Sequence, residues 1–203
     1  MTRRGRPRGF DVDTALDRAV DVFWRHGYEG ASLDDLTSAM GINRPSLYAA
    51  FGNKEQLFRL AVARYAQVDM AYAREALAEP TAAAVAASLL RRNVEAVTRP
   101  GRPAGCLTVQ GGTACSAGNE AVAQFLAASR LAGERHLAER FERAVDEGDL
   151  PAGTDAAGLA RFVMVVAEGH AVHAAAGVSA EDLHTATDIA LSAFFAHVST
   201  GHH

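Results

Sequence analysis

Residues 30–58 read GASLDDLTSAMGINRPSLYAAFGNKEQLF, and local signals in this stretch predict two short helices joined by a tight turn. Ser32 is a favourable N-cap, and Asp35 stands three residues later, where a capping box places an acidic or amide side chain. A helix is therefore expected over 33–40. Gly41 follows it and can supply the left-handed turn that ends such a helix.

A second short helix follows after that turn. Asn43 is its expected N-cap, and Pro45 lies in the first turn, where a missing N–H costs nothing. Leu47 and Phe51 are spaced i, i+4 and face inward. Upstream, 13–26 has apolar residues at helical spacing and ends at Gly27, so the pattern predicts three helices with a helix-turn-helix.

The start of the second helix of this motif carries side chains suited to a DNA groove. Arg44, Pro45, Ser46 and Tyr48 are expected to face outward there, at the end that enters the major groove in such folds. Arginine pairs with guanine or phosphate, serine with either, and tyrosine with a phosphate oxygen. The alternative is a plain three-helix bundle in which Tyr48 and Phe51 are both core.

Lys54, the only lysine of the chain, opens the next helix. Asn53 and Gln56 form an N-x-x-Q capping box around it. A cation in the first turn opposes the helix dipole, whereas a phosphate would be attracted by both the lysine and the helix N-terminus. This favours a phosphate contact over a merely solvated lysine.

The whole of 30–58, with Phe23 and Gly27-Tyr28 before it, resembles the DNA-binding signature of TetR-family transcriptional regulators. The resemblance implies a three-helix DNA-binding domain, a linking helix, and an all-helical C-terminal domain that dimerises and binds an effector. It also implies that Ser32 contacts a phosphate, with Arg44 and Ser46 at the operator and Tyr48 and Lys54 on its backbone. The expected domains are a basic arm (1–10), the DNA-binding domain (11–53) and the effector domain (54–203), whose linking helix is 54–78.

Composition favours helices, and the net charge differs between the N-terminal third of the chain and the rest. Among 203 residues there are 43 alanines and only 14 aromatics, which favours helices. Residues 1–66 carry a net charge of +2 and the remainder −6. The arm contains Arg3, Arg4, Arg6 and Arg8, which suit phosphates or a minor groove, although a solubilising tail is the alternative.

Two cysteines cannot make a disulfide-rich secreted scaffold, and neither a membrane span nor a signal peptide is predicted. The expected location is the cytoplasm. The acidic second part also disfavours a nucleoid protein that bridges DNA, which would need basic surface beyond the first domain.

The C-terminal part is expected to form six further helices, about nine in all, at 54–78, 81–98, 105–115, 119–147, 155–176 and 180–198. The last two are rich in small residues that permit close helix approach. By the family resemblance they would form a four-helix interface between two subunits, the alternative being a buried hairpin in a monomer. The two DNA-binding domains of such a dimer would then match a palindromic operator. Binding of a small-molecule effector would release the protein, a repressor, from that operator.

An effector pocket is expected among the middle helices, apolar with a few polar groups. The candidate lining residues are Leu89, Asn93, Val109, Gln110, Thr113, Phe125, Ser129, Met164, Val165 and Glu168.

Two further hypotheses compete with an organic effector. Cys106 and Cys115 could form a redox switch, which would need an exposed thiol of low pKa, and otherwise are small buried side chains. His170 and His173, at i, i+3, could bind a metal, although two ligands do not make a site. No metal and no cofactor is therefore predicted.

A helical-bundle metalloenzyme is the remote alternative. A di-iron centre needs two Glu-x-x-His motifs, and the chain has one such spacing, at Glu181 and His184. Nucleophile, phosphate-loop and dinucleotide motifs are missing from the sequence. Catalysis is not expected.

Overall fold

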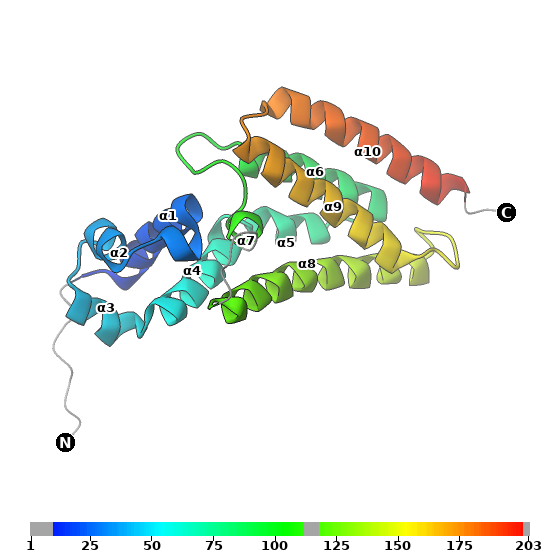
Figure 1. The fold of residues 1–203 in the computed structure, drawn as a ribbon. Coiled ribbons are helices and arrows are strands. Elements are labelled where there is room, and N and C mark those ends of the chain that lie inside the picture. The colour runs from blue at the N-terminus through cyan, green and yellow to red at the C-terminus, as the bar shows by residue number, and fades with distance from the viewer. Residues whose placement is uncertain (1–9, 112–117, 201–203) are drawn as a thin grey trace, which may run out of the picture.

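The computed structural model describes residues 10–111 and 118–200, and over them the chain is all-helical (Figure 1). These residues form ten helices and no strand. The helices are α1 (Val12–Gly30), α2 (Leu33–Met40), α3 (Arg44–Phe51), α4 (Lys54–Val68), α5 (Ala71–Leu77), α6 (Ala82–Val97), α7 (Leu107–Gln110), α8 (Glu120–Asp146), α9 (Ala156–Ala175) and α10 (Ala180–Thr200). Six residues named above, Arg3, Arg4, Arg6, Arg8, Thr113 and Cys115, lie outside the described part.

The predicted caps begin the helices of the N-terminal domain. The Ser32 hydroxyl accepts the Asp35 N–H at 3.1 Å, and the Asp35 carboxylate accepts the Ser32 N–H in return. Asn53 and Gln56 make the same reciprocal pair at the start of α4. Gly41 ends α2 with φ 69°, a left-handed conformation that a glycine adopts without strain.

The first helix extends past its expected end. Gly27 interrupts it with φ 68° and ψ 179°, as its position in the sequence predicted, but a helical turn resumes and continues to Gly30. Tyr28 follows the interruption and packs on the core, with its ring centroid 5.2 Å from that of Phe58.

The expectation of one linking helix over 54–78 was wrong. Helix α4 ends at Val68 and α5 begins at Ala71. Neither glycine nor proline marks the break, but Asp69 is 6% exposed and paired with Arg102 from a distant loop. This tertiary contact coincides with the end of the helix, and local sequence carries no sign of it.

A second correction concerns the helix expected over 105–115. Only Leu107–Gln110 is helical, Gly111 is already in a turn, and 112–117 lie outside the described residues. The remaining long helices agree with their predicted ranges to within one or two residues at each end.

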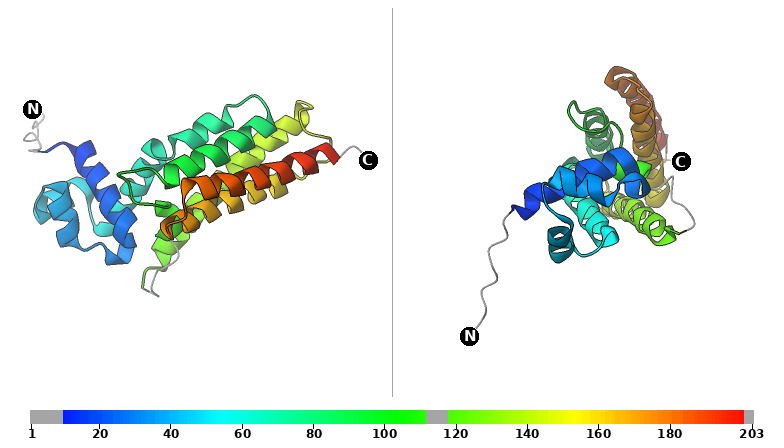
Figure 2. Two further views of the ribbon diagram at one scale, coloured as in Figure 1. Left: turned by 90° about the horizontal axis from the view of Figure 1, so that it is seen from above. Right: turned by 60° about the vertical axis from the view of Figure 1, so that its left-hand side comes forward.

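The molecule is elongated, with the helix-turn-helix at one end (Figures 1 and 2). Helices α1–α3 form a head, α4 runs from this head into the body, and α5–α10 form the body. Helix α10 lies on the outside of the body, beside α6 and α9. None of the helices in the described part of the chain has the length and apolar character needed to cross a membrane.

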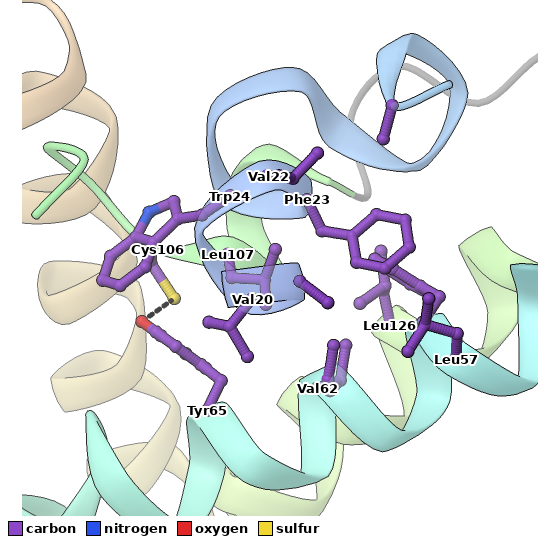
Figure 3. Close-up of a cluster of buried hydrophobic side chains, with 14 of the residues drawn as sticks. Val20, Val22, Phe23, Trp24, Leu57, Val62, Tyr65, Cys106, Leu107 and Leu126 are labelled. Carbon is purple, nitrogen blue, oxygen red and sulfur yellow. Dashed lines mark hydrogen bonds between the residues drawn. The ribbon is translucent and has the colours of Figure 1, made fainter. Parts of the chain in front are cut away.

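Two clusters of buried side chains hold these parts together. One joins the head to the body, since Phe23 and Trp24 of α1 share it with Tyr65 of α4 and with Leu107 and Leu126 of the body (Figure 3). The other lies wholly within the body, among α5, α6, α8, α9 and α10 and the loop before α9. The head is therefore packed on the body through a continuous core.

Candidate nucleic-acid interface

Helix α3 presents one face to solvent and buries the other. Leu47 is 0% and Phe51 5% exposed, which fixes the helix against the head. Arg44 and Pro45 at its start are exposed, and Tyr48 is 48% exposed one turn later. Tyr48 is therefore not part of the core, so the plain-bundle alternative is wrong for this residue, although it is correct for Phe51.

Ser46 and Ser32 lie at the starts of neighbouring helices. Ser46 is half-buried and lines a surface hollow of about 330 Å³ with Phe10 and with the turn 41–43. Ser32 is exposed, and its hydroxyl also donates to the Asp35 carboxylate at 2.6 Å. Ser46 is therefore partly accessible on α3, and Ser32 is accessible at the start of α2.

Arg44 has a neighbour that the sequence did not indicate. Its Nη2 donates to Asp34 Oδ1 at 2.8 Å, and both side chains are exposed, at 54% and 78%. Ten residues separate the two partners, so helix periodicity cannot relate them. Because both side chains are mostly exposed, water screens this pair, and the guanidinium stays accessible at the start of α3.

Lys54 is half-buried, unlike the fully solvated lysine of the alternative. Its Nζ lies 4.7 Å from the centroid of the Tyr28 ring, a cation–π contact. Burial lowers the pKa of Lys54, and the nearby Glu29 carboxylate opposes that effect. The ammonium is thus held at the start of α4 by an aromatic ring that sequence reasoning had not assigned to it.

The described candidates for the effector pocket differ in burial and in the protein groups that they contact. Leu89 and Val109 are buried core, Val165 is 64% exposed, and Ser129 donates to the carbonyl of Phe125 in its own helix. The other described candidates have protein partners. Asn93 binds Tyr72, Gln110 donates to the Ala104 carbonyl, the Phe125 ring lies 4.5 Å from the Arg59 guanidinium, Met164 packs on the body core, and Glu168 lies 3.7 Å from Arg130.

A hollow of about 790 Å³ opens elsewhere in the body, between the α4–α5 junction, α6 and the start of α10. None of the candidates within the described part of the chain lines it. Its polar lining includes Asp69, Tyr72, Glu75, Arg92 and Arg99. The hollow is therefore a more polar space than the one expected.

Asn93 belongs to a buried polar chain that crosses four helices. Its amide donates to the hydroxyl of Tyr72 at 2.9 Å, and its Oδ1 lies 3.0 Å from His170 Nδ1. His170 Nε2 lies 3.3 Å from the hydroxyl of Thr187, which donates to the carbonyl of Leu183. Burial, with smaller contributions from two nearby histidines, lowers the pKa of His170 to about 4.

These contacts contradict the metal hypothesis. Both ring nitrogens of His170 face protein partners, and His170 is 3% exposed whereas His173 is exposed. His170 is therefore a buried member of the polar chain, whereas His173 faces solvent. Within the described ranges, no three His, Cys, Asp or Glu side chains gather in a way that could hold a metal ion.

The environment of Cys106 does not match the redox hypothesis either. The thiol is buried and accepts a hydrogen bond from the Tyr65 hydroxyl at 3.3 Å (Figure 3). Burial, the largest contribution, and the neighbouring Cys106 raise the pKa of Tyr65. Cys106 is thus packed as a small core side chain rather than presented as an exposed thiol.

Comparison with known proteins identifies two domains along the chain. Residues 15–61 match the profile of bacterial regulatory proteins of the TetR family, and residues 82–190 match the C-terminal domain described as tetracyclin repressor-like. The first range contains the helix-turn-helix and the start of α4. The second contains most of the body.

Individual relatives agree over nearly the whole length. The chain is 35% identical over 184 residues to the HTH-type transcriptional repressor ComR of Escherichia coli (strain K12), a match that covers 89% of this chain and 87% of ComR. It is 46% identical to a cysteine mutant of the TetR-family regulator CifR solved with a 26-bp operator DNA, with TM-score 0.89 and coverage of 93% and 99%. A TetR regulator from Rhodococcus sp. RHA1 is 43% identical, with TM-score 0.61 and coverage of 89% and 97%.

The family consists of regulators rather than enzymes, which removes the metalloenzyme alternative. The chain belongs to the TetR family and is a DNA-binding transcriptional regulator.

Proposed function

We propose that this regulator is a cytoplasmic homodimer that represses transcription from a palindromic operator and releases it when a small molecule binds the body. The domain boundaries proposed are those of the sequence: a basic arm over 1–10, the DNA-binding domain over 11–53, and the effector and dimerisation domain over 54–203. ComR is named a repressor, and the CifR structure contains operator DNA. Both relatives support the same role here.

The observation that carries the proposal is the exposed edge of α3. Arg44, Pro45 and Tyr48 are exposed on a helix whose other face is buried, and its first turn contains no acidic residue. Such an edge can enter a major groove, where Arg44 would reach a base or a phosphate and Tyr48 a phosphate oxygen. Ser46 and Ser32 would add hydroxyl contacts nearby, and Lys54 would neutralise a phosphate at the start of α4.

The outer face of α9 and α10 supports the dimer. Phe162, Val165 and Val172 are exposed on α9, at positions that share one helical face. Ile189 and Phe195 are exposed on α10, at 69% and 38%. A large exposed apolar area on two neighbouring helices marks an interaction surface, and a second copy of this face would cover it by two-fold symmetry.

The DNA-binding part is tested on a duplex fragment taken from directly upstream of the protein's own gene. Tyr48→Phe and Lys54→Ala should both weaken binding on all sequences. Lys54→Ala should also flatten the salt dependence of binding by about one ion, because it removes a charge. Arg44→Ala should lose roughly 1–3 kcal/mol of discrimination at one base pair if it reads a base. Arg91→Ala, on the surface of the body, is the matched control and should bind as wild type. Wild-type binding by all three α3 and α4 variants would refute the interface.

The dimer is tested separately, without DNA. Ile189→Arg places a charge in the apolar face and should shift sedimentation toward the monomer. Leu131→Arg makes the same change at an exposed leucine of α8 (51% exposed) and should leave the dimer intact. Equal behaviour of the two variants would exclude this face as the interface.

A further inference from the structure

Arg102 is one of the residues that join the head of the molecule to its body, and it does so through charge. Arg102 lies in the loop between α6 and α7, which extends toward α1 (Figure 1). Its Nη1 donates to Asp21 Oδ1 of α1 at 2.5 Å. Its Nη2 and Nε donate to the two carboxylate oxygens of Asp69, at 2.6 and 3.1 Å.

The surroundings of Arg102 and Asp69 make their contact stronger than an ordinary surface ion pair, whereas the Asp21 side chain is 40% exposed. The Asp69 side chain is 7% and the Arg102 side chain 24% exposed, so water screens their attraction little. The pair is bidentate, the geometry in which arginine and carboxylate bind best. The guanidinium also lies 5.3 Å from the centroid of the Trp24 ring, again on α1.

The positions of the two carboxylates determine what Arg102 holds. Asp21 lies in the middle of α1, which packs along α4, while Asp69 is the C-cap of α4 itself. One guanidinium therefore fixes the head at α1 and at the point where α4 enters the body. The loop that carries it belongs to the body, since it connects α6 to α7.

In a dimer this contact has a consequence for DNA. The orientation of each head on its body sets the distance between the two α3 helices, and that distance must match the separation of two half-sites. We propose that Arg102 is a positioning residue that sets the half-site spacing accepted by the dimer, acting through Asp21 and Asp69. This inference rests on the proposed function, because it requires a dimer on a palindrome.

Asp21→Asn is the most informative variant. It weakens the contact between Arg102 and α1 and leaves the buried Arg102–Asp69 pair complete. The buried Asp69 carboxylate therefore keeps its charged partner, and the variant should fold. Asp17→Asn is the matched control, because Asp17 lies one turn earlier on α1 and pairs with Arg64 of α4 rather than with the body. The two variants remove the same charge from the same helix.

The experiment begins with a preferred palindrome that the wild-type protein selects from a random duplex pool. Binding is then measured on this duplex and on versions with one or two base pairs added to or removed from its centre. Each added base pair moves a half-site by about 3.4 Å and turns it by about 35°. The readout is the ratio of the affinities measured at different spacings, because a general change in charge or stability alters the affinity at every spacing alike.

The wild type and Asp17→Asn should discriminate strongly between spacings. Asp21→Asn should reduce that discrimination by about threefold to tenfold, because a head held less firmly adapts to the wrong spacing. Arg102→Met should reduce it further if that variant folds. Unchanged discrimination in Asp21→Asn, or an equal loss in Asp17→Asn, would overturn the role of Arg102. A wild type that selects no palindrome would instead refute the proposed function, and the spacing role with it.

Discussion

His170 gives a quantitative test of the buried polar chain in the body. Its pKa lies at about 4 in the fold against 6.5 for an unperturbed histidine, mainly because the ring is buried among Asn93, Thr187 and apolar neighbours. Between these two pH values the unfolded chain binds a proton that the folded chain does not. Stability is therefore lost as the pH falls from 6.5 towards 4.

The size of this loss follows from the two pKa values. Linkage gives a decrease of roughly 2 kcal/mol in the free energy of unfolding between pH 7 and pH 5. The histidines that contribute to the shift, His173 and His184, are exposed and half-buried, so solvent screens their part. We therefore expect about 1–2 kcal/mol.

The assay is urea unfolding at pH 7 and pH 5, at one fixed protomer concentration, because dimerisation makes stability depend on concentration. His170→Gln removes the titrating ring and should lose about 1–2 kcal/mol less than the wild type over this pH interval. His136→Gln, at an exposed position of α8, should behave as the wild type. An identical pH dependence in His170→Gln and the wild type would refute the inference that this ring is buried and uncharged.

Three further substitutions test the head and the body. Asp34→Asn removes a negative charge beside Arg44, so binding to random DNA should tighten while discrimination between operator and random DNA falls, which competition binding measures. Ser32→Ala removes the capping box of α2 and should destabilise the protein by about 1 kcal/mol in urea unfolding, whereas an unchanged midpoint would contradict the importance of this cap. Phe141→Ala empties a fully buried site in the body and should cost about 3–5 kcal/mol. A loss below about 1 kcal/mol at Phe141 would show that the body core rearranges around the cavity.

The sequence carries the features that act over a few residues. The capping boxes at Ser32 and Asn53 and the left-handed turn at Gly41 satisfy backbone groups three or four positions away, so their residue types predict their structure. The burial of Leu47 and Phe51 follows from their spacing. The exposed edge of α3 follows in turn, because a short helix that buries these two residues must present the others.

The parts that sequence reasoning missed involve contacts between distant positions. The pairing of Arg44 with Asp34 and of Lys54 with Tyr28 had no local signal. The hydrogen bond between Asn93 and Tyr72 had none either. Val165 illustrates the difficulty, since an apolar residue in a dimer surface and one in a cavity wall look alike in a sequence.

The amino-acid sequence by itself therefore determined that this protein is helical, where most of its helices begin, and which short helix faces outward. Only packing supplies the contact found at the end of α4, because the arginine that pairs with Asp69 lies 33 residues further along the chain and 81 residues from its other partner, Asp21. Capping and helix propensity reach only about one turn. An ion pair that spans the fold depends on where packing brings its partners, and no local pattern records that position.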